Sequence, residues 1–368
     1  MKIKTITCHD VNNYGASLQA FALQTYLTNL GHDVKIIDYV PEYMKTYNVW
    51  KIPESSHLYK ISKHLHFITV LFALKNYLKY RPTMGRIKAF QNFKLKYLHL
   101  TIRYKSFNEL AANPPKADIY IAGSDQIWST YLKNGQDAAF YCAFGDLNTR
   151  RISYAASFGF SEIKGGFNYF IKAMLTGFDV ISTRESTGVK IIESLNLKAC
   201  HVLDPVFLLN KQEWIRLFDI KSPIIKDKYL LVYDLFHTEQ ELKELSCFFA
   251  QKYGLKIVAV NDCSVTKYAN QNINNAGPVE FLNLILYSEY ILADSFHATA
   301  FSVIFRKQFY TFYSKGNISR MKDFLNSINL GERLNTSREL PDIEWEKHEE
   351  ILSRNIQYSK SFLKENIL

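Results

Sequence analysis

The sequence has no apolar run long enough to cross a bilayer. Its most apolar stretch, residues 65–74, stops at Lys75, whereas a membrane-spanning helix needs about 20 apolar residues. The amino terminus also lacks the long apolar core of a secretory signal peptide. The five cysteines are an odd number and include no Cys-x-x-Cys pair, which argues against a disulfide framework and for a reducing compartment. We therefore expect a cytoplasmic protein.

Several local catalytic motifs are also missing. The sequence contains no His-Glu-x-x-His, no paired Cys/His cluster, no phosphate-binding Gly-x-x-x-x-Gly-Lys-Ser/Thr loop and no Gly-x-Ser-x-Gly elbow. Metal hydrolases, nucleotide hydrolases and α/β-hydrolases need these fixed spacings, so none of those classes is indicated. A Gly-x-Gly-x-x-Gly dinucleotide motif is absent after the first predicted strand. We expect neither a metal ion nor an organic cofactor.

The composition is that of a globular protein large enough for two cores. Of the 368 residues, 47% are hydrophobic and 22% are charged, and single cores usually stop growing at roughly 250–300 residues. Short apolar runs alternate with helical patterns in both halves of the chain, and Pro205 marks the hinge between them. The sequence therefore predicts an α/β fold of two Rossmann-like lobes with a cleft between them.

The predicted boundaries follow from this alternation. The first lobe covers 1–210, the second lobe covers 211–342, and 343–368 form a final helix that packs back on the first lobe. A basic, aromatic and helical insertion occupies 41–110. The strands expected in the two lobes are 1–7, 34–39, 118–122, 151–156, 178–182 and 197–203, followed by 229–233, 256–260, 290–293 and 308–312.

The first predicted helix follows a small polar loop at 12–15. Its apolar residues recur at helical spacing between Leu18 and Leu27, and Gly31 provides its carboxyl-terminal cap. We expect an amphipathic helix. Gly15 has two interpretations of equal weight: a tight turn without a ligand, or close approach of the backbone to a substrate.

Most of the net charge of +10 comes from one segment. Residues 51–105 contain twelve lysines and arginines but only one acid, Glu54. Leucine, phenylalanine, tyrosine and isoleucine lie between these cations, a composition that suits peripheral contact with an anionic membrane surface or with a lipid-linked ligand. A solvated basic face would have the same composition, so both interpretations stay open.

Polar side chains follow many of the predicted strands. Because the carboxyl ends of parallel strands meet at one edge of a sheet, these side chains are candidates for a ligand site. His297 falls in the first turn of a helix, and an arginine, a histidine and a helix amino terminus together suit a phosphate-bearing anion. The candidates are Ser124, Asp125, Ser157, Arg184, Ser295, His297, Asn317 and Arg320.

Six motifs occur in a fixed order along the chain. They are Asn13–Ala20, Gly123–Trp128, Ser153–Gly159, Ser182–Glu185, Leu203–Leu209 and the stretch Ala293–Phe305 around His297. Together they resemble the polysaccharide pyruvyl transferase family, from about Asn12 to about Arg333. The resemblance implies a fold similar to that of GT-B glycosyltransferases. It also implies transfer of the enolpyruvyl group of phosphoenolpyruvate to two hydroxyls of a sugar, which forms a cyclic ketal and releases phosphate.

The resemblance assigns Arg184 and His297 to the handling of the donor. With the strand-end residues Ser295, Asn317 and Arg320, they are the expected donor-binding set. His297 either pairs with the donor anion or relays a proton, since imidazole can do both near neutral pH.

Asp125 is the candidate that holds or deprotonates the acceptor, a sugar or a lipid-linked oligosaccharide. The expected acceptor-binding residues are Asn13, Tyr14, Gly15, Ser124, Asp125 and Gln126.

Each of the three central candidates has a plainer interpretation. Asp125 could be a carboxylate that caps its own turn, Arg184 a surface ion pair with Glu185, and His297 a histidine packed in a turn.

Two other functions fit parts of the sequence. A GT-B-like glycosyltransferase that uses a nucleotide sugar would share the lobes and the cationic site. A nucleic-acid-binding module could use 51–105, but it would not need a second lobe with polar strand ends, so we expect no nucleic-acid partner.

Overall fold

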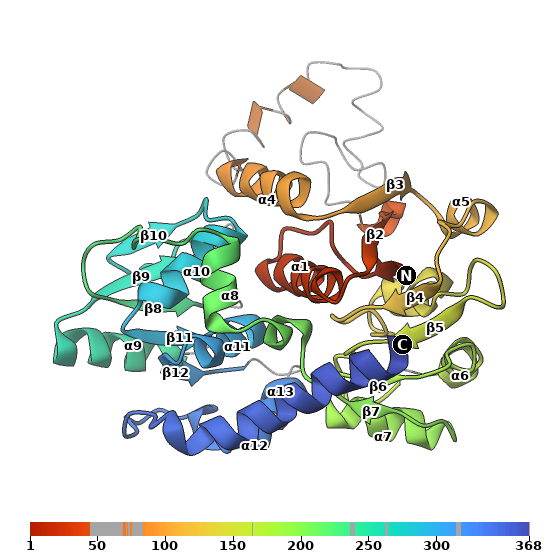
Figure 1. Ribbon diagram of the computed structural model, residues 1–368. Helices are drawn as coiled ribbons and strands as arrows, with labels where there is room; N and C mark the ends of the chain where they lie inside the picture. Colours follow the sequence, from red (N-terminus) through yellow and green to blue (C-terminus); the bar gives the residue numbers. More distant parts are fainter. Residues whose placement is uncertain are drawn as a thin grey trace.

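The structure, a computed structural model, describes residues 1–44, 69–70, 72, 74–75, 84–163, 165–235, 240–261, 264–313 and 318–367. Each half of the chain contains a parallel five-stranded sheet, and the two sheets belong to separate lobes (Figure 1). The predicted α/β fold with two Rossmann-like lobes is confirmed. No helix in the part of the chain described here is long and apolar enough to span a membrane.

The sheet of the first lobe has the order β3-β2-β1-β4-β5, with all neighbours parallel. Two short strands extend it, because bridges join Ile152 to Val180 and Ala156 to Thr183. The carboxyl ends of β4 to β7 therefore lie along one edge. The strands are β1 (Lys2–Ile6), β2 (Asp33–Tyr39), β3 (Leu100–Tyr104), β4 (Ile119–Ala122), β5 (Arg150–Ser153), β6 (Ser182–Thr183) and β7 (Cys200–His201).

The second lobe repeats this arrangement with the order β10-β9-β8-β11-β12, again entirely parallel. Its central strands are runs of buried apolar residues, as expected where helices cover both faces of a parallel sheet. The strands are β8 (Tyr229–Tyr233), β9 (Lys256–Val260), β10 (Gln271–Ile273), β11 (Tyr290–Ala293) and β12 (Gln308–Thr311).

Helices surround the two sheets and fill the space between them (Figure 1). In the first lobe and its extension they are α1 (Tyr14–Asn29), α4 (Met84–Tyr97), α5 (Phe107–Ala112), α6 (Asn168–Leu175) and α7 (Ser186–Ser194). The remainder are α8 (Lys211–Leu217), α9 (Gln240–Tyr253), α10 (Pro278–Tyr287), α11 (Phe296–Ile304), α12 (Ile318–Ser327) and α13 (Glu346–Ile367).

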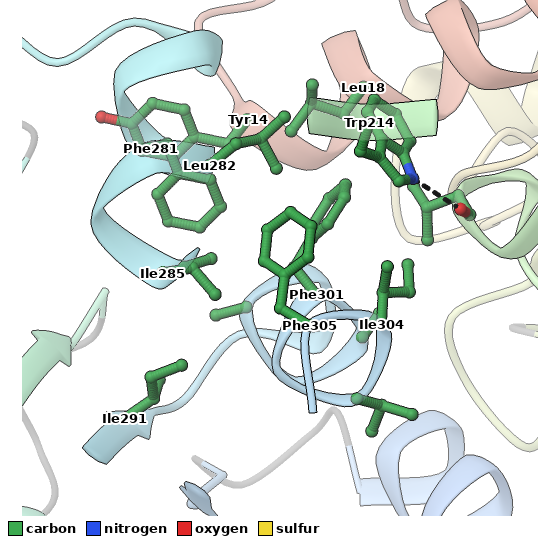
Figure 2. Close-up of a cluster of buried hydrophobic side chains, with 14 of the residues drawn as sticks. Tyr14, Leu18, Trp214, Phe281, Leu282, Ile285, Ile291, Phe301, Ile304 and Phe305 are labelled. Carbon is green, nitrogen blue, oxygen red and sulfur yellow. Dashed lines mark hydrogen bonds between the residues drawn. The ribbon is translucent and has the colours of Figure 1, made fainter. Parts of the chain in front are cut away.

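Helix α1 is buried on all sides and not amphipathic, so that expectation is wrong. Every residue from Tyr14 to Leu27 is buried, because the helix contacts α10 and α11 of the second lobe as well as its own sheet. Figure 2 shows the resulting apolar cluster, in which Tyr14 and Leu18 meet Trp214, Phe281 and Phe301. Each fully buried side chain of this size contributes about 1.5–3 kcal/mol. This packing holds the two lobes together.

The carboxyl-terminal helix α13 runs along both lobes (Figure 1). Near its start, Leu352 joins the cluster of the second lobe. Near its end, Phe362 and Leu363 pack in a cluster with Leu27 of the first lobe. The hydroxyl of Ser359 also accepts a hydrogen bond from the backbone of Leu203. The helix therefore contacts both lobes.

The 41–110 segment differs from the expected helical insertion. Its described part contains α4, but it also contributes β3, the outer strand of the first sheet, so the helical prediction is wrong at 100–104. The alternation of Leu100, Ile102 and Tyr104 with polar residues has the period of a strand, but five residues are too few to stand out. Much of the remaining insertion lies outside the described residues.

Candidate active site

A pocket of about 410 Å³ opens where the carboxyl edges of the two sheets face each other. Ligands of open α/β sheets bind at such edges. Its walls come from both lobes: Cys8, Val11, Asn13, Met44, Asp125, Gln126, Leu132 and Asn134 from the first, and Leu235, Asp294, Ser295, Phe296, His297 and Arg320 from the second.

The second lobe presents the amino terminus of α11 to this pocket. Strand β11 ends at Ala293, and Ser295 takes the N-cap position in extended conformation. The Ser295 side chain makes no capping hydrogen bond, while both oxygens of Asp294 accept from the backbone of Leu235 at 2.9 Å. The first turn of α11 therefore offers the backbone N–H groups and positive dipole end that favour an anion.

His297 lies directly against α1 of the first lobe. A Cβ placed on Gly15 would lie 1.9 Å from Nδ1 of His297. Gly15 is not part of the pocket wall, and the close approach to its backbone is made by this imidazole. Gly15 lies in the first turn of α1, so its interpretation as a tight turn is wrong, and its contact with a substrate stays a prediction.

Asp204 joins groups from both lobes in the buried region beside the pocket. Its Oδ2 accepts hydrogen bonds from Nη1 of Arg184 at 2.5 Å and from Oγ of Ser124 at 3.0 Å. The same oxygen lies 3.5 Å from Nε2 of His297. Its Oδ1 accepts from the backbone of Val206. Burial alone would raise the pKa of Asp204, but the positive groups of His297 and Arg184 hold this pKa well below its usual range.

Arg184 is a buried residue, so its interpretation as a surface ion pair with Glu185 is wrong. Its side chain is 1% exposed, it pairs with Asp204, and its guanidinium lies 4.6 Å from the ring centre of Phe296. Glu185 instead accepts a hydrogen bond from Ser157. The Nε and Nη2 groups of Arg184 are buried without a partner. Unsatisfied buried donors are rare in proteins, and here they suit a bound anion.

Arg320 provides a second buried cation, from α12. It lines the pocket and is 8% exposed. When the side-chain amide of Gln126 is oriented with its oxygen toward Arg320, that oxygen accepts a hydrogen bond from Nη1 of Arg320 at 2.9 Å. Burial and the nearby charge of Arg184 lower the pKa of Arg320 to about 10. Two guanidinium groups that repel each other in a buried site favour an anionic ligand.

Asp125 caps its own turn and also lines the pocket. Its carboxylate accepts a hydrogen bond from the backbone of Gln126 at 2.8 Å, as a turn-capping residue does, and the residue also lines the pocket. Its φ of +82° is in the left-handed region, which costs about 1–3 kcal/mol for a residue with a side chain. The bridge between Asp125 and Ala156 helps to fix this conformation.

The remaining predicted acceptor residues are divided. Asn13 caps α1 by accepting a hydrogen bond from the backbone of Ala16. Asn13 and Gln126 both line the pocket. Tyr14 does not: its ring stacks on Phe281 with centres 4.2 Å apart, so its role in the structure is packing between the lobes. Ser124 is fully buried next to Asp204, behind the pocket wall.

Asn317, a predicted donor residue, lies outside the described residues.

Sequence reasoning missed two residues of this site. Asp204 lies in one of the six motifs, but that motif was interpreted only as the hinge at Pro205, and Asp204 was given no role. The signal was available, since a carboxylate that follows the predicted strand 197–203 lies at the same sheet edge as Ser124 and Arg184. Cys8, which follows β1, lines the pocket for the same reason. Among the described residues, no cluster of histidine, cysteine and acidic side chains could hold a metal ion.

Comparisons with known proteins identify the family. No curated protein matches the sequence. Among solved structures, the fold is similar to the UDP-GlcNAc 2-epimerase of Neisseria meningitidis bound to UDP-GlcNAc (10% identity, 100% of this chain and 94% of that chain covered, TM-score 0.45). It is also similar to that of Methanocaldococcus jannaschii (14% identity, 96% and 92% covered, TM-score 0.46). The family model "Polysaccharide pyruvyl transferase" matches residues 13–316. The chain therefore belongs to the polysaccharide pyruvyl transferase family.

Proposed function

We propose that this enzyme transfers the enolpyruvyl group of phosphoenolpyruvate to two hydroxyls of a sugar in a surface or capsular polysaccharide, or in its lipid-linked precursor. The observation that carries the proposal is the buried guanidinium of Arg184. Two of its nitrogens have no partner, and the second buried cation, Arg320, lies close enough to repel it. A donor with a phosphate and a carboxylate would satisfy both cations.

In this proposal the donor lies between the lobes. Arg320, which lines the pocket on α12, binds one anionic group. The other group reaches past Phe296 to the two unpartnered N–H groups of Arg184, which lies behind that ring. Ser295 and the first turn of α11 add hydroxyl and backbone donors. His297 is the proton carrier or a further anion contact. Asn317 remains a proposed donor residue.

The reaction needs one proton donor and one proton acceptor. The π electrons of the donor form a C–H bond at the methylene carbon with a proton from a general acid, which leaves an oxocarbenium-like centre. A first sugar hydroxyl attacks that carbon and loses its proton, and phosphate then leaves with the C–O bonding pair. A second hydroxyl attacks and loses its proton, which closes the ketal. Of the two hydroxyl protons lost, one replaces the proton delivered to carbon and the other leaves on phosphate.

On the acceptor side, we propose that Asp125 holds or deprotonates an attacking hydroxyl, with Asn13 and Gln126 as further contacts. All three line the pocket on the first lobe. A lipid-linked acceptor would reach this pocket at the cytoplasmic face of a membrane, and the basic 51–105 segment would contact that surface.

The test is incubation of the protein with phosphoenolpyruvate and a panel of sugar acceptors, with measurement of released phosphate and of the ketal by mass spectrometry. We expect equal amounts of both products with at least one acceptor. Binding of UDP-sugars or GDP-sugars in a parallel titration, without binding of phosphoenolpyruvate, would contradict the proposal and favour a nucleotide-sugar glycosyltransferase.

A further inference from the structure

One carboxylate oxygen contacts cations from both lobes. Oδ2 of Asp204 pairs with Arg184, which follows β6 of the first lobe, and faces His297, which lies on α11 of the second. The side chain of Asp204 has no exposed surface. Asp204 does not line the pocket, so it can act on a ligand only through the groups that it contacts.

The ring of His297 has one nitrogen turned to the protein and one left for a ligand. Nε2 is sealed from solvent and lies 3.5 Å from Oδ2 of Asp204. That separation is an ion-pair distance, longer than a good hydrogen bond. The exposed part of His297, which lines the pocket, therefore does not include Nε2. Nδ1 lies on the edge of the ring beside Gly15 and, unlike Nε2, is not sealed from solvent, so it is the nitrogen that a ligand can reach.

We propose that Asp204 is a positioning residue that holds Nε2–H of His297 and keeps the ring protonated, so that Nδ1 delivers the proton to the methylene carbon of phosphoenolpyruvate. This inference rests on the function proposed above. In the step, the Nδ1–H bond breaks, its electron pair stays on nitrogen, and the carbon–carbon π pair forms the new C–H bond. The neutral ring then takes a proton from the attacking hydroxyl, which restores the imidazolium.

The charges around His297 explain why it needs this carboxylate. Arg184, which shares Asp204 with His297, and Arg320, which lines the same pocket, are buried cations that disfavour a protonated ring. Asp125 across the pocket and Asp294 on the strand end before α11 favour it, but the two oxygens of Asp294 already accept from Leu235. Asp204 is the acid within 4 Å of the imidazole in the described residues.

The variant Asp204→Asn tests the inference, because it preserves the shape of the side chain and removes its charge. We expect kcat to fall on the order of 10²-fold. We also expect the alkaline limb of the kcat–pH profile to move to lower pH by about one unit or more. An unchanged alkaline limb in a folded variant would overturn the inference.

The matched control is Asp38→Asn. Asp38 is also a buried carboxylate that contacts a histidine and an arginine, His9 at 3.0 Å and Arg103 at 2.9 Å, but it does not line the pocket. Its loss should lower thermal stability and leave the alkaline limb in place. An equal shift of the limb in both variants would mean that general loss of a buried carboxylate causes it, and would overturn the inference.

A measurement on the unchanged protein does not depend on turnover or on the folding of a variant. With ¹⁵N-labelled histidine, His297 is assigned by the signal that is missing in His297→Gln. We expect the neutral ring to carry its proton on Nε2, and a proton on Nδ1 would overturn the inference. If the wild-type protein shows this tautomer but does not turn over phosphoenolpyruvate, the proposed function fails and the contact between Asp204 and His297 stands.

Discussion

The imidazole of His297 lies against the backbone of Gly15, so close that a Cβ on Gly15 would come within 1.9 Å of Nδ1. This contact joins the first helix of one lobe to the first turn of α11 in the other. The absence of a side chain at position 15 therefore decides where the proposed proton carrier can lie.

The variant Gly15→Ala should remove activity without unfolding the protein. The new methyl group would push the ring out of its place, and a displacement of about 1 Å in a catalytic group can cost on the order of 10²-fold in rate. Phosphate release and thermal unfolding are the two measurements. Gly165→Ala is the matched control, because a Cβ there meets no atom within 4 Å. Full activity of Gly15→Ala would mean that the position of His297 does not matter for the reaction.

Arg184→Lys tests the proposed donor site. Lysine keeps the positive charge near Asp204 but loses the planar group with two unpartnered nitrogens. We expect the affinity for phosphoenolpyruvate to weaken by about tenfold or more, with a smaller change in the unfolding temperature. Isothermal titration calorimetry measures the affinity directly. Equal affinity in the variant and the wild type would show that these nitrogens do not bind the donor.

Arg320 should make anion binding depend on pH in the alkaline range. Its pKa is lowered to about 10 by burial and by Arg184. As the pH rises through that value the guanidinium loses its charge, so the attraction for an anion is present below it and is lost above it. We expect the thermal stabilisation by inorganic phosphate to decline across this range in the wild type and to stay flat in Arg320→Gln. If the stabilisation by phosphate declines equally in the wild type and in Arg320→Gln, the decline comes from titratable groups other than Arg320 and the prediction is wrong.

The sequence was sufficient to predict most of the sheets. The expected strands 229–233, 256–260 and 290–293 coincide with β8, β9 and β11, because fully buried parallel strands are short apolar runs bounded by turn residues. The short outer strands β3 and β10 were missed, since edge strands bury less and carry polar residues. The domain boundaries after 210 and 342 stay a prediction, because α13 packs against both lobes.

The sequence predicted which strand ends contribute residues to the site, but it did not predict which of those residues contact one another. His297 and Arg320 line the pocket as the sequence suggested, and Arg184 lies behind Phe296. That Asp204 would link Arg184 to His297 could not be foreseen, because His297 belongs to the second lobe and the contact depends on how the two lobes pack together. For the same reason, the apolar period of α1 could not show that α10 and α11 of the second lobe cover its other face.

Binding of phosphoenolpyruvate should not require a divalent metal ion. Arg184, Arg320 and the amino terminus of α11 can together neutralise a phosphate and a carboxylate, which is the task that a magnesium ion performs in many phosphate sites. We expect the dissociation constant, measured by calorimetry, to be the same in EDTA and in magnesium. Loss of binding in EDTA that magnesium restores would contradict this expectation and would require ligands that the described residues do not supply.

The basic 51–105 segment is the proposed contact with an anionic membrane. Within its described part, some cations are already occupied: Lys94 and Arg103 pair with Asp10, and Arg86 donates to backbone oxygens of both lobes. Others are exposed, namely Lys75, Lys88, Lys96 and Lys105. Only the exposed cations are available to anionic lipid headgroups, each at about 1 kcal/mol.

The triple variant Lys88→Glu, Lys96→Glu and Lys105→Glu should therefore weaken binding to anionic vesicles in a co-sedimentation assay. We expect the wild type to pellet with vesicles that contain phosphatidylglycerol and not with neutral phosphatidylcholine, and we expect added salt to release it. The control replaces Lys226 and Lys228, two exposed lysines of the second lobe, with glutamate. If the wild type pellets equally with both kinds of vesicle, or with neither, or if the control loses as much binding, the segment is a solvated basic face and the acceptor reaches the pocket without it.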